Sequence, residues 1–433
     1  MNSKESSYLS FKRKWSLPED WKVVPFKTYY STNKGLSITK ANLVEKGIPV
    51  ISYGQIHSKT GIFFEAEGLP FVDESYLNNS SAILDKGDVV FADTSEDIEG
   101  SGNISIKDSD ATILAGYHVV VAKPKKIINY RYAGYMFDSF SYRSQIQSKV
   151  QGIKVYSITQ KMILDTKIWI PPLEVQGKIA SAIDKDVTII DDILENTKLS
   201  IEQLKQYKKS LITEVVTKGI NPNIEFQQSE IGWAEKIPRH WKVRRLKELY
   251  HVIDERNLDE NATLLSLFTA IGVKPRKEME QRGNKAVTVI DYKKVEVDDL
   301  VVNKLLAWMG SIGYSDYVGV TSPDYDVYRK RENANVSRRY YNYYFRDTDF
   351  KSDCYKVGRG IMMMRWRTYP EQFLSILVAN PPFEEQEEIA DYLDKKVVEI
   401  DKLIESKTKI ILELESYKKS LIFEYVTGRK VVE

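Results

Sequence analysis

The chain has 433 residues, enough for two to four domains with cores of their own, and an ordinary globular composition. Its single cysteine, Cys354, excludes an intrachain disulfide, and the N-terminal MNSKESSYLSFKRKW has no apolar run typical of a signal peptide or membrane anchor. We therefore expect a cytoplasmic protein. Four scattered histidines and one cysteine provide almost no material for a zinc or Cys/His catalytic site.

The net charge of +2 conceals an uneven distribution. Residues 1–170 contain 21 basic and 18 acidic side chains (net +3), and residues 237–380 contain 25 and 19 (net +6). By contrast, residues 171–217 contain 6 and 8 (net −2), and residues 381–427 contain 7 and 12 (net −5). Basic segments suit a polyanionic partner, although so small an excess is a weak indication by itself.

The start of the chain contains the first of several repeated motifs. Residues 1–16 are polar, and we expect a frayed lead-in. The following LPEDWKV, residues 17–23, recurs as IPRHWKV at residues 237–243. We interpret Trp21 and Trp241 as hydrophobic plugs that fix the start of each half to its domain.

The two bodies that follow, residues 24–170 and 244–380, differ in sequence but share a rhythm. Short β-type runs alternate with glycine, asparagine and proline turns, which predicts mixed α/β domains with much strand. In each body one such run, at residues 86–91 or 297–302, leads into a glycine turn. Unlike bodies between matching ends are expected if each body recognises something different.

Each body is followed by a copy of one long helical segment. Residues 171–217 align with residues 381–427 at a constant offset of 210, without a gap and with roughly half the positions identical. Apolar residues recur at alternating steps of three and four, the pattern of a coiled-coil seam. The predicted seam residues are Ile183, Ile190, Ile201, Leu204 and Leu211 in the first copy and Leu393, Ile400, Ile411, Leu414 and Leu421 in the second.

The seam is interrupted at the same two positions of both copies, Thr197 with Lys407 and Lys208 with Lys418. Polar seam residues can fix register and partner choice. Lysines near a helix end can instead simply extend their ammonium groups into solvent. The sequence leaves both interpretations open.

A helix of about 44 residues at roughly 1.5 Å per residue is about 65 Å long and cannot bury its seam alone. We therefore predict that the two copies pair in an intramolecular antiparallel coiled coil with pseudo-twofold symmetry, joining two mixed α/β (α+β) globular domains. Such a pair of helices would work as a ruler. The predicted segments are a first domain (1–170), first helix (171–218), linker (219–236), second domain (237–380) and second helix (381–433).

Basic and amide side chains in both bodies are the candidate nucleic-acid contacts. Arginine presents a fork to guanine edges and phosphates, and glutamine presents one to adenine. Tyrosines at 340–344 could pack against sugars and bases, or could form core beside a solvated basic flank. The candidates are Arg143, Gln145, Gln147, Lys149 and Lys154 in the first body and Arg329, Lys330, Arg331, Arg338, Arg339, Arg359, Arg365 and Arg367 in the second.

Taken together, the motifs resemble the specificity subunit of type I restriction-modification systems. They are the Leu/Ile-Pro-x-x-Trp-Lys-Val starts, the Pro-Pro-Leu/Phe-Glu-x-Gln-x-x-Ile-Ala helix starts, the Tyr-Lys-Lys-Ser-Leu-Ile-x-Glu helix ends and the Val-Thr-x-Gly stops. The resemblance covers nearly the whole chain. It departs slightly where Gly177 stands opposite Glu387 and where Lys218 precedes Gly219.

The resemblance implies a DNA-binding function without catalysis. Each body would be a target recognition domain that reads one half of a bipartite double-stranded DNA sequence, and the helices would set the unread gap. The chain would not be an enzyme, but would scaffold two methyltransferase subunits and join endonuclease-translocase subunits. S-adenosylmethionine and ATP are accordingly expected on those partners, with no cofactor on this chain.

Two other functions are weighed against this one. Asn380-Pro381-Pro382-Phe383 matches the signature with which amino-methyltransferases hold a flipped adenine, which would suit a self-sufficient DNA adenine methyltransferase. The first copy, Ile170-Pro171-Pro172-Leu173, lacks the asparagine and the aromatic residue, so we expect a coincidence. The remaining alternative is a coiled-coil adaptor without a DNA role.

Overall fold

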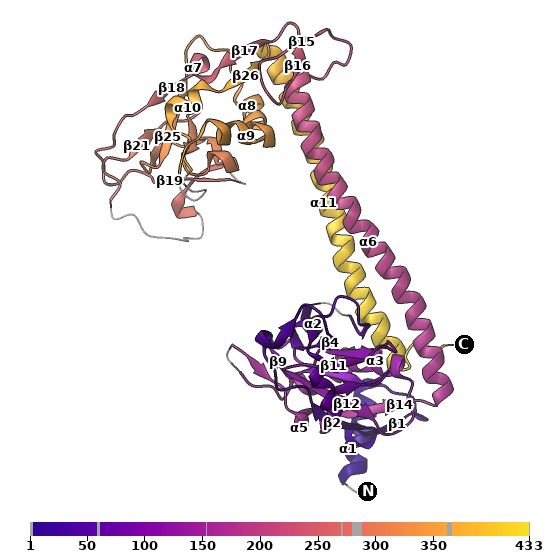
Figure 1. Cartoon of the computed structure of the whole chain (residues 1–433). Coiled ribbons are helices and arrows are strands. Elements are labelled where there is room, and N and C mark those ends of the chain that lie inside the picture. The colour runs from indigo at the N-terminus through magenta and orange to yellow at the C-terminus, as the bar shows by residue number, and fades with distance from the viewer. Residues whose placement is uncertain are drawn as a thin grey trace. The chain divides into compact units, whose positions relative to one another are not determined.

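The computed structural model describes residues 3–58, 61–152, 154–269, 272–278, 288–361 and 366–432. The chain forms two compact units, residues 1–197 with 409–433, and residues 198–408. Two long helices, α6 (Leu173–Lys218) and α11 (Phe383–Val426), contribute to both units (Figure 1). Each compact unit therefore contains one body and half of each helix, whereas the sequence analysis treated the helices as separate segments.

The first unit is built on two five-stranded sheets and two strand pairs. The sheets have the orders β2-β12-β8-β10-β5 and β3-β6-β4-β11-β7. Its helices are α1 (Ser3–Trp15), α2 (Tyr53–Ser58), α3 (Tyr130–Asp138), α4 (Phe140–Gln147) and α5 (Gln160–Leu164). Its strands are β1 (Lys22–Pro25), β2 (Tyr30–Lys34), β3 (Leu43–Val44), β4 (Ile48–Ile51), β5 (Phe63–Phe64), β6 (Phe71–Val72), β7 (Ile83–Leu84), β8 (Val89–Ala92), β9 (Thr94–Ser95), β10 (Ile104–Lys107), β11 (Ile113–Ala115), β12 (Val119–Pro124), β13 (Tyr156–Ser157) and β14 (Lys167–Ile170).

The central strand β8 is apolar throughout because it is covered on both faces. Val89 and Phe91 face a core that includes residues of α3 and α4, while Val90 and Ala92 face a second core. Side chains alternate across a strand, so a strand between two cores needs apolar residues at every position. This explains the unbroken run VVFA.

The second unit has a four-stranded sheet of order β18-β25-β22-β23 and four strand pairs. Its shorter helices are α7 (Leu246–Leu249), α8 (Arg338–Arg346), α9 (Thr348–Val357) and α10 (Pro370–Ser375). Its strands are β15 (Phe226–Gln228), β16 (Lys236–Pro238), β17 (Lys242–Arg245), β18 (Tyr250–Ile253), β19 (Leu265–Phe268), β20 (Gly272–Pro275), β21 (Lys293–Val295), β22 (Leu300–Asn303), β23 (Ile312–Tyr314), β24 (Gly319–Thr321), β25 (Tyr325–Lys330) and β26 (Leu377–Asn380).

The N-terminal segment corrects one expectation. Instead of a frayed lead-in, Ser3–Trp15 form helix α1. Phe11 and Trp15, four residues apart and so on one helix face, contact the body: the Phe11 ring centroid lies 5.9 Å from that of Trp169, and Trp15 is only 8% exposed. These aromatic contacts, together with a 2.6 Å hydrogen bond from Lys167 Nζ to the Ser7 hydroxyl, attach the helix to the body.

The long helices pack in antiparallel fashion within each unit. In the first unit the seam residues Ile183 and Ile190, near the start of α6, share a core with Leu421, near the end of α11. In the second unit Leu211, near the end of α6, shares a core with Leu393, near the start of α11. All ten predicted seam residues are buried or half-buried.

Two of the lysines that interrupt the seam form ion pairs between the helices. Lys418 Nζ lies 2.7 Å from both carboxylate oxygens of Asp191, and Lys208 Nζ lies 2.7 and 2.8 Å from those of Asp401. Asp191 and Asp401 are themselves equivalent at the 210-residue offset. The structure thus favours a role in register over simple extension into solvent.

Candidate nucleic-acid interface

Each body is attached to its helices by an equivalent arginine–aspartate contact. In the first unit Arg131, on α3, donates to both oxygens of Asp184 at 2.7 and 2.8 Å. In the second unit Arg339, on α8, donates to Asp391 and Asp394 at 2.6 Å and to Glu387 at 3.0 Å. Hydrogen bonds donated to Asp184 raise the pKa of Arg131, and those donated to the three α11 carboxylates raise the pKa of Arg339.

A buried glutamine in each helix start makes a second repeated contact. Gln176 accepts a hydrogen bond from the backbone N–H of Asn129 at 2.9 Å, and Gln386 accepts one from Ser337 at 2.7 Å. Each side-chain amide also donates to the carbonyl oxygen of its own Pro-Pro motif, at 2.9 Å in both cases. The glutamine of the Pro-Pro-x-Glu-x-Gln motif therefore ties the helix start to the body.

The helix ends rest on the two repeated tryptophans. Gly428 and Gly219 adopt positive φ angles of 72° and 75°, which favour glycine. A Cβ atom on Gly428 would lie 3.0 Å from the ring of Trp21, and one on Gly219 would lie 3.3 Å from the ring of Trp241. Both tryptophans are buried, so they act as plugs between the start of a body and the end of a helix.

Three of the candidate arginines in the second body are bound to carboxylates of their own unit. Arg329 donates to both oxygens of Asp299 at 2.8 Å, and Arg338 pairs with Asp298 at 2.7 Å and also with Asp316. Arg339 is held by α11, as described above. The donors of these guanidinium groups that a base edge or phosphate would use are therefore already bound to carboxylates, in a bidentate manner in the case of Arg329.

The other candidates in the second body lie nearer to solvent. Lys330 and Arg359 are exposed, and the exposed Arg331 donates through Nε to the carbonyl oxygen of Lys247 at 2.9 Å. Arg359 and half-buried Arg367 exchange two backbone hydrogen bonds, at 2.9 and 3.0 Å. Arg365 lies outside the described residues.

Most candidates in the first body bond to the backbone of that body. Gln145 exchanges two hydrogen bonds with the backbone of Lys167, at 2.8 and 2.9 Å. Arg143 and Gln147 both donate to the carbonyl oxygen of Glu99. Lys149 makes a long contact of 3.4 Å to a carbonyl oxygen, and Lys154 is exposed.

The tyrosines of α8 belong to the core. Tyr340, Tyr341 and Tyr344 are fully buried, which rules out base stacking by these rings in the folded chain and supports the alternative of a core helix with a basic flank. Tyr341 also donates to the side-chain oxygen of Asn380 at 2.9 Å, and Gln386 donates to the same atom at 3.1 Å. Asn380 therefore has a structural role in the Asn-Pro-Pro-Phe motif.

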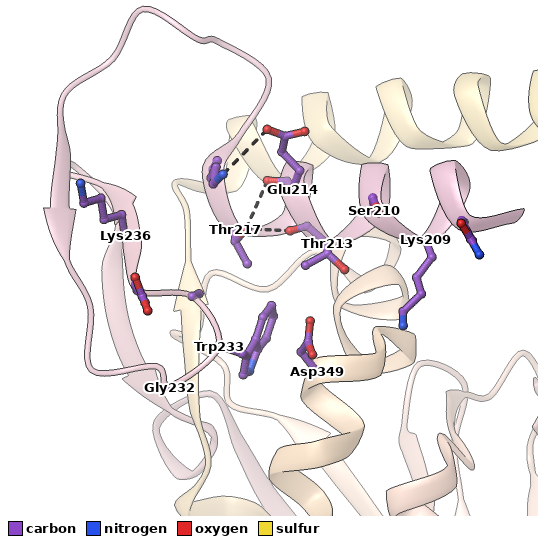
Figure 2. A pocket seen from close by; sticks show the side chains of 13 residues that line it. Lys209, Ser210, Thr213, Glu214, Thr217, Gly232, Trp233, Lys236 and Asp349 are labelled. Carbon is purple, nitrogen blue, oxygen red and sulfur yellow. Dashed lines mark hydrogen bonds and ion pairs between the residues drawn. The ribbon is translucent and has the colours of Figure 1, made fainter. Parts of the chain in front are cut away.

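A large hollow, of about 1090 Å³, lies in the second unit at the end of α6 (Figure 2). Figure 2 shows Lys209, Thr213 and Trp233 around it, together with Asp349 of α9. Trp233 comes from the linker and is held by a 2.7 Å hydrogen bond from its Nε1 to Asp353. None of the residues that line this hollow is among the predicted DNA contacts.

The contacts that attach each body to the helices were not predicted from the sequence. Arg131 and Arg339 occupy the second position of equivalent helices, and their partners Asp184 and Asp394 are equivalent at the 210-residue offset. The available signal was an arginine in the body and an aspartate in the long helix that recur in both halves at nearly the same separation, 53 and 55 residues. In the described residues no group of three or more His, Cys, Asp or Glu side chains is placed to hold a metal, and no helix there could span a membrane.

The chain thus contains two bodies of different sequence. Each is attached by an equivalent contact to one of two duplicated helices, an arrangement that suits a protein with two recognition domains. Residues 18–203 match the family model for the type I restriction modification DNA specificity domain. The chain is 24% identical over 431 residues to the putative type I restriction enzyme MjaX specificity subunit of Methanocaldococcus jannaschii, covering 95% of this chain and 94% of the relative. It is 25% identical over 438 residues to the MjaVIII specificity subunit of the same organism, covering 95% and 93%.

Solved structures have the same fold. The HsdS subunit of Thermoanaerobacter tengcongensis aligns with a TM-score of 0.56 and 16% identity over 96% of this chain and 98% of that one. A chain from a structure on complex assembly and conformational transition of the type I R-M system aligns with a TM-score of 0.68 and 15% identity, over 95% and 98%. The family model over residues 18–203 and the two curated relatives support the resemblance to type I restriction-modification specificity subunits seen in the motifs.

Proposed function

We propose that this chain is the DNA-recognition subunit of a type I restriction-modification complex, with each body reading one half of a bipartite target. The observation that carries the proposal is the duplicated attachment. Arg131–Asp184 and Arg339–Asp394 hold two bodies of different sequence on equivalent helix positions. A repeated frame that presents two unlike surfaces suits two different half-sites.

The same proposal assigns the chemistry to partners. Two methyltransferase subunits carry S-adenosylmethionine, and endonuclease-translocase subunits use ATP. This chain scaffolds both kinds of subunit and catalyses no reaction itself. The complex works in the cytoplasm. The structural role of Asn380 supports this assignment over a self-sufficient methyltransferase, because the amide oxygen that would hold an adenine amino group already accepts two hydrogen bonds.

Among the candidate contacts, the exposed cations are the ones that we propose as the DNA-binding residues. They are Lys149 and Lys154 in the first body and Lys330, Arg331 and Arg359 in the second. Surface cations suit phosphate contacts, which position a protein on the duplex, whereas base contacts specify sequence.

Duplex binding measured against salt concentration tests DNA recognition. The affinity of the purified chain, with its methyltransferase partner, should fall steeply as salt rises, because bound cations displace counterions from phosphates. Absent or salt-independent binding would favour the coiled-coil adaptor. Methylation by the chain alone would favour the self-sufficient enzyme.

Exchange of one body tests the division of labour. Replacing residues 24–170 with the body of another specificity subunit should change one half-site and leave the other unchanged. Methylation sequencing of DNA treated with the chimera and its methyltransferase reads both half-sites at once. Changes in both half-sites would refute independent reading, and replacement of residues 244–380 provides the reciprocal control.

A further inference from the structure

The second unit contains a cationic hollow of about 470 Å³ that is separate from the candidate DNA contacts. It lies between α6, the end of α8 and the start of α9, with all of its lining residues in one compact unit. Asp347 is the carboxylate that lines it. The five cations that line it are Lys205, Lys208, Lys209, Arg346 and Lys351.

Two of these cations are paired and three have no acidic partner among the described residues. Lys208 is held by Asp401, and Lys205 lies 3.5 Å from Glu202. Lys209, Arg346 and Lys351 form no ion pair in that part of the chain. Uncompensated positive charges that share one recess repel one another, so this arrangement favours an anion.

Asp347 is poorly placed to neutralise the three unpaired cations. One of its oxygens accepts a 2.8 Å hydrogen bond from the backbone of Asp349, capping α9, and the other accepts from Thr213. Arg346 is half-buried, its Nε has no hydrogen-bond partner, and burial lowers the pKa of its guanidinium group. A buried N–H donor without a partner costs free energy, which an acceptor in the hollow would recover.

The equivalent place in the first unit carries a different charge pattern. At the offsets of 208 for the body helices and 210 for the long helices, Asp138 stands for Arg346 and Glu415 stands for Lys205. Arg143, the equivalent of Lys351, lies 3.7 Å from Asp138. An acidic residue thus stands in the first unit where a cation, Arg346, lines the hollow in the second.

We propose that the hollow of the second unit binds a compact, multiply charged phosphate ligand, such as the diphosphate or triphosphate chain of a nucleotide. The recess can surround several phosphate oxygens with ammonium and guanidinium donors from two sides. A DNA duplex spreads single charges along a stiff backbone and meets exposed cations more easily than recessed ones. The inference does not depend on the proposed DNA recognition.

Calorimetric titration of inorganic pyrophosphate into the full chain tests the proposal. Binding with one site per chain is expected. Arg346→Asp introduces the residue found at the equivalent position of the first unit. This substitution should weaken pyrophosphate binding about tenfold or more, because it replaces a cationic hydrogen-bond donor with a carboxylate that repels the anionic ligand. Lys209→Glu, at an exposed position, provides a second variant that does not disturb the buried part of α8.

Arg239→Asp is the matched control. It makes the same charge change at an exposed residue whose described partner is Glu225, and it should leave pyrophosphate affinity unchanged. Equal weakening in all three variants would show only general charge attraction and would overturn the proposal, as would absence of pyrophosphate binding. Loss of duplex affinity in Arg346→Asp without any pyrophosphate binding would identify a DNA phosphate contact and would also overturn it.

Discussion

At the scale of single residues, the arginines of this chain lie in two different settings, bound to a long helix or exposed to solvent. Arg131 and Arg339 hold a body to a helix through carboxylates, whereas Arg359 is exposed and lies 5.0 Å over the ring of Tyr369. The planar guanidinium group suits attachment to a helix and the proposed DNA contact equally, since its fork matches a carboxylate as well as a phosphate. Residue type alone therefore could not separate attachment from DNA contact.

Substitution of Arg339 should affect stability more than DNA affinity. Arg339→Ala removes the ion pairs to α11 and is expected to lower the free energy of unfolding by about 1 kcal/mol, a modest value because the network is partly exposed. Urea unfolding and duplex binding measure the two effects. Arg359→Ala, the control in the same unit, should show the reverse pattern; a large loss of DNA affinity in Arg339→Ala alone would contradict this assignment.

Asp394 should contribute to acid sensitivity. Burial acts to raise the pKa of its carboxyl group, but hydrogen bonds from Arg339 and Tyr343 outweigh burial and leave the pKa below its ordinary value. A depressed pKa gives stability that is fully present above the unfolded value of about 4 and is lost as the pH falls through the folded value. Unfolding midpoints of wild type and Asp394→Asn should therefore differ at pH 6 and converge on acidification; a difference that persists at acidic pH would contradict this assignment.

At the scale of elements, the long helices use two kinds of contact. Apolar seam residues provide the burial that a long helix cannot find alone, and the pairs Lys208–Asp401 and Lys418–Asp191 add directional contacts between the helices. A one-residue shift of either helix would separate these charges. The ion pairs thus favour the observed register over neighbouring ones.

Exchanging the charges of one pair tests this role. Lys208→Asp or Asp401→Lys alone should lower the free energy of unfolding by about 0.5 to 1 kcal/mol, because like charges then face one another. The double variant should recover most of the loss in urea unfolding. The same exchange at Lys418 and Asp191 provides an independent repeat, and additive losses in either double variant would show that the pairs do not interact.

At the scale of the whole molecule, we expect helix length to set the spacing between the two proposed half-sites, because the helix is duplicated. Insertion of one heptad into both long helices, at the equivalent positions after Thr197 and Lys407, preserves the seam period and adds about 10 Å, roughly three base pairs of DNA. Methylation sequencing should show a longer unread gap between unchanged half-sites. An unchanged gap would exclude helix length as the ruler, and a four-residue insertion, which breaks the heptad register, is the control.

The sequence by itself determined the duplication, the mixed α/β class of both bodies and the helical seam, because these depend on local periodicity and on a repeat at constant offset. It did not reveal that α1 packs through Phe11 and Trp15 or that Tyr341 lies in the core, since burial depends on what the rest of the chain places opposite a side chain. Only the tertiary structure separated attachment arginines from exposed ones. The carboxylates that distinguish them lie about 50 residues away along the chain, and only folding brings them within hydrogen-bonding distance.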